Sequence, residues 1–403
     1  MKAGFLCCAV VWGVLLMARI GYGENNIKHP NVSGQFYPSD PKELSALLDG
    51  FFARADVALA QLPVGAVIVP HAGYVYSGPV AAYAFKRVSA QKIATVVILA
   101  PSHFANFDGI SVGDYAGMET PLGVVSVDKT IVDRVIAADP KFAFYAPAYE
   151  REHSLEVEIP FIQKTFPSAK IVPVIFGQAA PETIQKFSAA LKDALGDRAD
   201  TLIVASSDLS HYHDDKTARK MDAAVLELAR KLDVEKLWEA NVSGRLEMCG
   251  FIPVAAVLVY SRLQNWGNAE LIRYGNSGDA TGDRDRVVGY GAVAIYRGLA
   301  VPADSSVDNA APPLTLAQKK RLLEIARQSM EQYVRKGKVM DVQENDPRLA
   351  MTEGAFVTLK RRGQLRGCIG NIIGQGPLYL TVRNMAIAAA TQDPRFPPVK
   401  SEE

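Results

Sequence analysis

Short runs rich in valine and isoleucine alternate with amphipathic stretches from residue 27 to residue 298, and this alternation constrains the fold more than any other feature. The short runs predict buried strands at residues 65–69, 95–99, 171–176, 201–205 and 287–296. The amphipathic stretches predict helices at residues 42–53, 79–86, 129–137, 181–194 and 216–232. Alternation of this kind is typical of an α/β domain, here with a mixed sheet flanked by helices.

The composition changes where this domain ends. Residues 299–313 carry several Pro, Ser and Asp residues and little periodic hydrophobicity, which predicts a linker. Thr315 then opens a predicted helix, and Gln318 is placed for a capping box. Strands are predicted at residues 354–359 and 367–373 and a second helix at residues 377–391, so residues 314–403 form a second module of the α+β kind.

The charge balance argues against a nucleic-acid partner. The chain has 44 Lys and Arg residues against 43 Asp and Glu residues, for a formal net charge of +1 at pH 7. Nucleic-acid binding depends on an excess of positive charge that neutralises phosphates, and this chain has none overall. After the first residues, no stretch is long and apolar enough to span a bilayer.

Residues 1–23 form a distinct N-terminal segment. Lys2 precedes an uncharged apolar run over residues 3–17, followed by Arg19 and small residues, which predicts a secretory signal peptide. The alternative is an uncleaved anchor, but the run is shorter than a spanning helix needs. We therefore expect an exported protein, periplasmic or extracellular. If the signal is not used, the protein is membrane-anchored or cytoplasmic, and the membrane is a partner only through an uncleaved segment.

The cysteines do not form a disulfide framework. Two of the four lie in the leader, and the other two, Cys249 and Cys368, belong to different modules. A lone cysteine is usually a small buried hydrophobic residue, and this expectation holds for Cys368. Cys249 differs because it lies in a turn bounded by Gly250 and Pro253, just before an apolar helix, where its thiol can point into a cleft.

Three of the six histidines follow predicted buried strands. His71, His103 and His211 come shortly after residues 65–69, 95–99 and 201–205. Because parallel strands end at one edge of a sheet, these side chains are expected to meet in one cleft. A single loop histidine is more often structural, but three at equivalent strand ends predict a functional site. His153 is either a fourth member of this cleft or a polar residue at the start of a helix, and no function is predicted for His29 or His213.

Imidazole and thiolate together are ligands of iron, copper and zinc, so Cys249 and the strand-end histidines predict a metal site. Asp208 lies three residues before His211, where it can orient an imidazole, bind the metal or satisfy its own turn. The chain has no phosphate-binding loop of the Walker type and no dinucleotide-binding glycine motif. The glycine-rich acidic segment at residues 275–289 is predicted to be a turn region near the cleft.

The motifs together resemble the Memo family, whose prokaryotic members are called AmmeMemoRadiSam system protein B. The resemblance runs from residue 32 to residue 296. It is carried by residues 70–74 and 77–78, 101–103, 152–156, 206–208 with His211, and 249–250. It implies a fold similar to that of the LigB-type class III extradiol dioxygenases.

The resemblance also implies roles for single residues. His71 and His103 match the two histidine ligands of a non-haem iron, with copper or zinc as alternatives, and Cys249 takes the place of the carboxylate ligand. His211 matches the acid–base histidine, with Asp208 beside it. Because a thiolate changes the charge and redox potential of such a site, ring cleavage is not implied.

Three functions follow as hypotheses. The leading one is a metal-dependent redox protein, resembling a dioxygenase, that acts on a small molecule or on dioxygen with His211, Asp208 and His153 as candidate catalytic residues. The second is an adaptor whose cleft binds a peptide or protein. The third is a zinc hydrolase, which is disfavoured because no motif supplies an obvious glutamate base.

The second module resembles the AMMECR domain, or AmmeMemoRadiSam system protein A. The resemblance rests on residues 365–370 and 393–396, and we expect the domain to be incomplete because the chain ends soon afterwards. It establishes no reaction for Cys368. In prokaryotes the two modules accompany a radical SAM protein, which the resemblance therefore implies as a partner.

Overall fold

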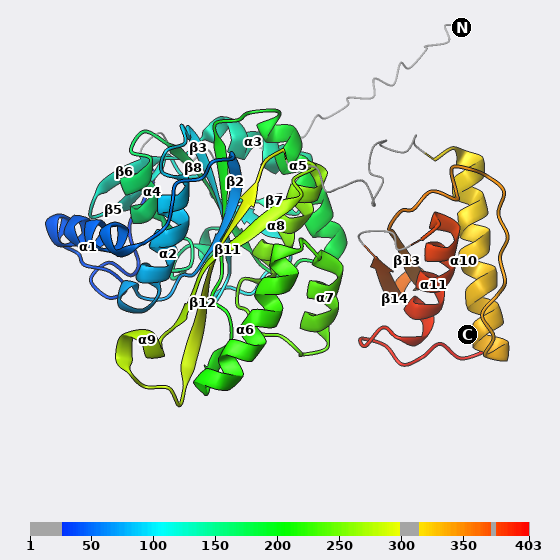
Figure 1. Ribbon diagram of the computed structural model, residues 1–403. Helices are drawn as coiled ribbons and strands as arrows, with labels where there is room; N and C mark the ends of the chain where they lie inside the picture. Colours follow the sequence, from blue (N-terminus) through cyan, green and yellow to red (C-terminus); the bar gives the residue numbers. More distant parts are fainter. Residues whose placement is uncertain (1–25, 299–313, 372–375, 403) are drawn as a thin grey trace, which may run out of the picture.

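The structure, a computed structural model, describes residues 26–298, 314–371 and 376–402. The predicted signal peptide at residues 1–23 and the predicted linker at residues 299–313 lie outside these ranges. No helix among the described residues has the length and apolar character needed to cross a membrane. The described residues form two modules, which Figure 1 colours along the sequence.

A mixed sheet forms the centre of the first module. Four neighbouring strands run parallel at its centre in the order β2 (Val64–Val69), β9 (Thr201–Ser206), β3 (Thr95–Pro101) and β8 (Lys170–Phe176). Antiparallel strands flank these four: β12 (Val287–Tyr296) beside β2, and β4 (Ile110–Val112) beside β8. Among residues 26–298, the sheet has nine strands, the others being β7 (Phe142–Ala143), β10 (His211–His213) and β11 (Asn268–Asn276).

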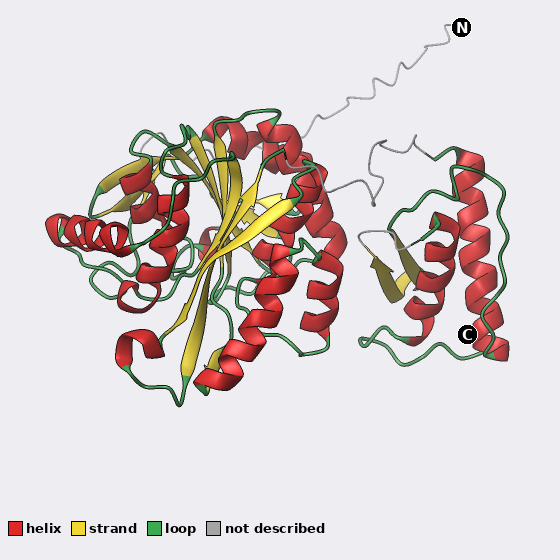
Figure 2. Cartoon of the chain, in the orientation of Figure 1, coloured by secondary structure: helices red, strands yellow, loops and turns green. Residues whose placement is uncertain are grey.

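Helices cover both faces of this sheet (Figures 1 and 2). One face carries α1 (Pro41–Arg54), α2 (Tyr74–Val88) and α4 (Ile159–Thr165). The other carries α5 (Pro181–Leu195), α6 (Asp215–Arg230), α7 (Val234–Val242) and α8 (Phe251–Leu263). Because both faces are covered, nearly every residue of the four central strands is buried, which explains why these strands are continuous runs of Val and Ile.

Smaller elements complete the module. α3 (Lys129–Ala138) packs beside α5, and a separate sheet among the described residues contains β1 (Ile27–Lys28), β5 (Gly117–Thr120) and β6 (Gly123–Ser126). The 3-10 turns η1 (Ala146–Ala148) and η2 (Glu156–Glu158) precede α4.

The predicted mixed sheet flanked by helices is confirmed, and two of the local differences have a clear physical reason. Helix α2 begins at Tyr74, five positions before the predicted start, because Pro79 lies inside the helix and does not mark its first turn. Strand β11 was not predicted because it pairs along the edge with β12, so only part of its length is buried. The segment at residues 275–289 contains the end of β11, the short helix α9 (Gly278–Thr281) and the start of β12.

In the second module one helix packs on a hairpin and a second helix packs on the first. Helices α10 (Leu316–Lys336) and α11 (Leu378–Thr391) accompany the antiparallel strands β13 (Ala355–Arg361) and β14 (Gln364–Asn371). The predicted capping box is present: the Thr315 Oγ1 accepts from the Gln318 backbone N–H, and the Gln318 side chain accepts from the Thr315 N–H. The core of this module includes Leu322, Ala326, Leu349, Leu378, Val382 and Ala386.

Candidate metal centre

Three adjacent parallel strands deliver side chains to one edge of the sheet. His71, Asp208 and His103 each lie two residues beyond the last residue of β2, β9 and β3. Because these strands are neighbours in the sheet and run in the same direction, an equal offset places the three residues in a row. This is the edge at which the sequence predicted a site.

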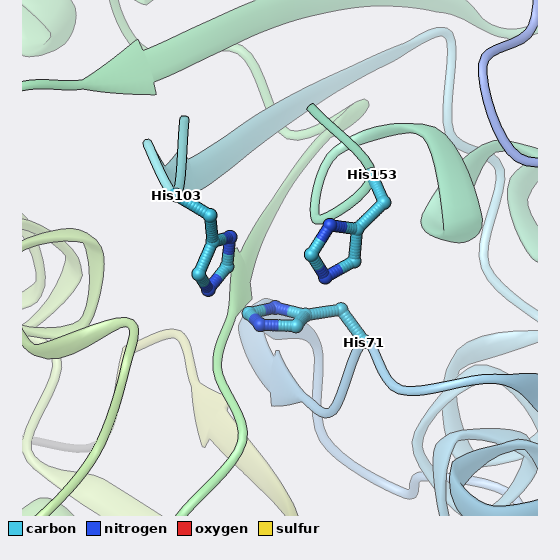
Figure 3. A group of neighbouring side chains, drawn as sticks. All are labelled: His71, His103 and His153. Carbon is cyan, nitrogen blue, oxygen red and sulfur yellow. The ribbon is translucent and has the colours of Figure 1, made fainter. Parts of the chain in front are cut away.

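Three imidazoles converge at this edge (Figure 3). One ligand atom from each of His71, His103 and His153 lies within 4.8 Å of the other two. The ring centroid of His103 lies 5.2 Å from that of His71 and 4.7 Å from that of His153. His71 is buried, whereas His103 is exposed, so the cluster opens to solvent on one side.

Cys249 reaches the same cluster from the turn before α8. Its Sγ lies 3.0 Å from the Nε2 of His71 and accepts a 3.2 Å hydrogen bond from the backbone N–H of Asp208. Cys249 and His103 both line a cleft of about 320 Å³. A Cβ added to Gly250 would lie 2.3 Å from the Ser206 carbonyl oxygen, so the close approach of this turn to the end of β9 requires glycine.

The buried carboxylate of Glu152 orients the His103 ring. It accepts hydrogen bonds from the His103 Nδ1 and from the backbone N–H groups of His153 and Ser154, each at 2.9 Å, and from the His103 backbone N–H at 2.5 Å. Burial alone raises the pKa of Glu152, but these hydrogen bonds, those from His103 foremost, lower the pKa to about 2. An ionised Glu152 accepts a hydrogen bond from the His103 Nδ1–H, which leaves the Nε2 lone pair free.

His71 is held in a similar way. Its Nδ1 lies 2.8 Å from the Ser206 Oγ, and its backbone N–H donates to the Asp208 Oδ1 at 2.8 Å. Burial, with the nearby His103 and His153, holds the pKa of His71 well below its usual value. Burial and the Asp208 carboxylate raise the pKa of the Cys249 thiol, so without a metal the thiol keeps its proton.

The predicted proton-transfer residues lie beside this cluster. Burial raises the pKa of Asp208 to about 7, while hydrogen bonds from the His71 and Ala72 backbone N–H groups oppose the rise. His211 begins β10 and is half-buried, and burial lowers its pKa. Among the described residues, the Asp208 carboxylate accepts from these backbone groups, and no hydrogen bond joins it to the His211 ring.

The two remaining histidines contact carboxylates. His213 lies 3.0 Å from Glu247, and the His29 Nδ1 lies 2.5 Å from Glu119.

Sequence reasoning missed two residues that support this cluster: Ser206 as the partner of His71, and Glu152 as the partner of His103. Both residues lie in segments that carry the family resemblance, 152–156 and 206–208, but no role was predicted for either. His153 was predicted as a catalytic residue, and the structure places it among the groups able to bind a metal.

The fold and the cluster define a class: a mixed α/β protein with imidazoles and a thiol gathered at the carboxyl edge of its central strands. The family model described as "Memo-like protein" matches residues 28–294, and the model described as "AMMECR1" matches residues 323–403. The chain belongs to the Memo-like protein family and carries an AMMECR1 domain after it.

Named relatives agree with this assignment. A MEMO1 family protein of Nitrosopumilus maritimus is 35% identical over 272 residues, covering 66% of this chain and 98% of the relative. One from Caldivirga maquilingensis is 36% identical over 279 residues, covering 67% and 99%. One from Aquifex aeolicus is 34% identical over 271 residues, covering 66% and 97%. Among solved structures, an uncharacterized protein from Pyrococcus horikoshii matches 21% of this chain and 44% of its own, with 40% identity and a TM-score of 0.20.

Proposed function

We propose that the cleft binds a non-haem iron, with copper or zinc as alternatives, and that the protein is a metal-dependent redox protein. The observation that carries this proposal is the arrangement of the two strand-end imidazoles. The Nδ1 atoms of His71 and His103 each have a fixed partner, Ser206 and Glu152, so both Nε2 atoms are left for a metal. The Nε2 of His71 already faces the Cys249 Sγ at 3.0 Å.

The donor set suits such a metal. Two imidazoles and a thiolate form a borderline-to-soft site of the kind that binds iron, copper and zinc. When bound, iron or copper would supply Lewis acidity and a one-electron redox couple. Cys249 must release its proton to become a ligand, which makes metal binding at this site a proton-releasing event.

His153 is the competing third ligand. Its ring lies 4.7 Å from that of His103, and burial lowers its pKa to about 4, so it is neutral near pH 7. We favour Cys249 because its sulfur lies 3.0 Å from a His71 nitrogen and because it lines the cleft together with His103. His153 then packs between His103 and Phe36, whose ring lies 4.8 Å from its own.

Proton transfer is assigned to Asp208 and His211. Asp208 has a pKa of about 7, so its carboxyl group can both accept and release a proton near neutral pH. His211 lies close enough for its charge to affect both His71 and His103. The substrate is a small molecule or dioxygen, and the resemblance to class III extradiol dioxygenases does not extend to a proposal of ring cleavage.

Metal analysis followed by oxygen uptake tests the proposal. The full chain purified without added metal is expected to carry about one iron or copper ion per chain. Incubated with a reductant, it is expected to consume dioxygen, and His211→Gln is expected to slow consumption by about 100-fold while retaining the metal. A chain that binds neither iron, copper nor zinc at micromolar concentrations contradicts the proposal.

Exposed aromatic residues near the cleft favour a second function, an adaptor that binds a peptide or protein. Phe104 is 50% exposed beside His103, and Tyr212 is 63% exposed beside His211. Arginines stack on both rings, Arg151 on Phe104 at 4.8 Å and Arg286 on Tyr212 at 5.2 Å. In an adaptor, Phe104→Ala and Tyr212→Ala would abolish partner binding and leave the metal content unchanged.

Two further proposals concern the setting of the protein. Export by the leader is tested by sequencing the N-terminus of the mature protein, which is expected to begin after residue 23. A radical SAM protein is proposed as a partner, and co-purification of the two proteins when they are expressed together tests that proposal.

A further inference from the structure

The Ser206 hydroxyl lies at the centre of a buried junction. Among the described residues, three polar atoms lie within hydrogen-bond distance of its Oγ. They are the His71 Nδ1 at 2.8 Å, the Ser154 carbonyl oxygen at 2.8 Å and the Glu158 Oε1 at 2.7 Å. Ser206, Ser154 and Glu158 are all buried, so this junction must be satisfied internally.

Counting the donors and acceptors around the Ser206 hydroxyl limits where the hydrogens can lie. A hydroxyl donates one hydrogen and accepts up to two, whereas a carbonyl oxygen can only accept. For all three contacts to be hydrogen bonds, the Ser206 hydroxyl must donate to the Ser154 carbonyl, and the other two partners must donate to the Ser206 oxygen. His71 donates from Nδ1, and the Glu158 carboxyl group donates only if it carries a proton.

We propose that Glu158 is a positioning residue of the metal centre: as a neutral acid it donates to Ser206 and, through Ser206, holds His71 in the tautomer protonated on Nδ1. The Nε2 lone pair of His71 then faces the Cys249 sulfur, ready for a metal. This protonation pattern is inferred for the metal-free protein. The role of Glu158 in positioning a metal ligand rests on the proposed function.

Three glutamates of one segment show why Glu158 differs. Glu152 accepts from three backbone N–H groups and an imidazole, and Glu156 accepts from the Asn31 and Val32 backbone N–H groups and from the Tyr37 hydroxyl. For Glu158, Ser206 is the one side-chain partner that the described residues provide, and no Lys or Arg among them forms an ion pair with it.

The surroundings of Glu158 favour the neutral acid. Its side chain is buried, and burial together with the nearby Asp208 carboxylate raises its pKa well above the usual value, which outweighs the hydrogen bond that Ser206 would donate to the ionised carboxylate. An ionised Glu158 would take the Ser206 hydrogen and deprive the Ser154 carbonyl of its donor. That arrangement leaves a buried charge and a buried carbonyl less well satisfied.

Nuclear magnetic resonance on the metal-free full chain tests the protonation pattern directly. Chain labelled with carbon-13 in the glutamate carboxyl groups is expected to show one neutral glutamic acid at pH 7, whose signal disappears in Glu158→Gln. Nitrogen-15 shifts of His71 are expected to report a proton on Nδ1. An ionised Glu158, or a His71 protonated on Nε2, overturns the proposal without any variant having to fold.

Titration with cobalt(II) tests the positioning role. Glu158→Gln keeps a neutral donor in place and is expected to change cobalt(II) affinity by less than about threefold. Ser206→Ala removes the acceptor of the His71 Nδ1–H and is expected to weaken cobalt(II) affinity by about 10- to 100-fold. Glu152→Gln removes the ionised partner of His103 and is expected to weaken cobalt(II) affinity by a similar factor. Equal losses in Glu158→Gln and Glu152→Gln would show that Glu158 acts as a carboxylate and overturn the proposal.

The two tests separate this proposal from the proposed function. A wild-type chain that shows the neutral acid and the Nδ1 tautomer but binds no cobalt(II) contradicts the metal centre and the positioning role, and leaves the protonation pattern standing. A chain that binds cobalt(II) with an ionised Glu158 contradicts only the inference made here.

Discussion

Each module of this protein contains one cysteine, and the two cysteines have opposite surroundings. The Cys249 sulfur lies 3.0 Å from a His71 nitrogen and shares a cleft with His103. The Cys368 sulfur lies on β14, 3.2 Å from the Thr358 hydroxyl. All six histidines of the chain lie at or before residue 213, so the second module has no imidazole to share a metal or take a thiol proton.

The comparison shows that the two cysteines are packed alike beside a glycine and differ in the side chains near the sulfur. Both cysteines adjoin a glycine that lies against a backbone carbonyl. A Cβ on Gly250 would lie 2.3 Å from the Ser206 oxygen, and a Cβ on Gly367 would lie close to the Ala389 oxygen. What separates the two cysteines is their neighbours: an imidazole lies at the Cys249 sulfur and a hydroxyl, that of Thr358, at the Cys368 sulfur. The Cys368 backbone N–H donates to Asp393, and its carbonyl accepts from Arg395.

The largest expected effect on metal binding comes from removing the Cys249 sulfur. Cys249→Ala is expected to weaken metal binding by about 100-fold, since a structural site of four ligands stabilises its ion by about 10–16 kcal/mol in total. Cys368→Ala, the matched control, is expected to leave the metal content unchanged. Competition titration with a chelator measures the metal affinity of both variants. Equal affinities would contradict a role in metal binding that Cys249 has and Cys368 lacks.

The paired glycines provide the next test. Gly250→Ala and Gly367→Ala each force a methyl group against a backbone oxygen, so each is expected to destabilise its own module by up to about 3 kcal/mol. Gly250→Ala alone is expected to lower metal affinity, because it displaces the turn that carries Cys249. Hydrogen exchange locates the destabilised module, and loss of metal affinity in Gly367→Ala would contradict the comparison.

The third prediction concerns the carboxylate that anchors Cys368. Asp393 accepts from the Cys368 backbone N–H at 2.7 Å, and its hydrogen bond with Arg395, which outweighs the effect of burial, lowers its pKa to about 2. Because this pKa lies below the unfolded value of 3.8, the ionised group stabilises the module above pH 4 by about 2 kcal/mol. This contribution decreases as the pH falls from 4 to 2.

Asp393→Asn is therefore expected to destabilise the second module by about 2 kcal/mol at pH 7 and by about half as much, about 1 kcal/mol, at pH 3. Hydrogen exchange of the β13 and β14 amides, corrected for the intrinsic rate at each pH, measures the difference. A loss of equal size at both pH values would show that Asp393 does not act through its charge.

The smallest expected effect is at the start of the second module. Thr315→Ala removes the side chain that caps α10 and is expected to destabilise the module by about 1 kcal/mol. Thr315→Ser keeps the capping oxygen and serves as the control. Denaturant-dependent hydrogen exchange of α10 distinguishes the two variants, and equal protection in both would exclude a contribution from the cap.

The sequence predicted the fold and the strand-end histidines because buried parallel strands have a recognisable pattern and end at one edge. Cys249 lies 178 positions from His71, so periodicity cannot bring them together, and the family resemblance was needed. Ser206 and Glu152 escaped prediction because their roles depend on hydrogen bonds that only tertiary structure forms. The same limit applies to Glu158, whose single buried partner distinguishes it from Glu152 and Glu156.

X-ray absorption spectroscopy of the full chain loaded with zinc tests the central claim most directly, because sulfur and nitrogen scatter differently. With His71, His103 and Cys249 as ligands, the spectrum is expected to require one sulfur at about 2.3 Å and nitrogens at about 2.0–2.1 Å. A shell of nitrogen and oxygen alone would remove Cys249 from the metal centre and assign its place to His153.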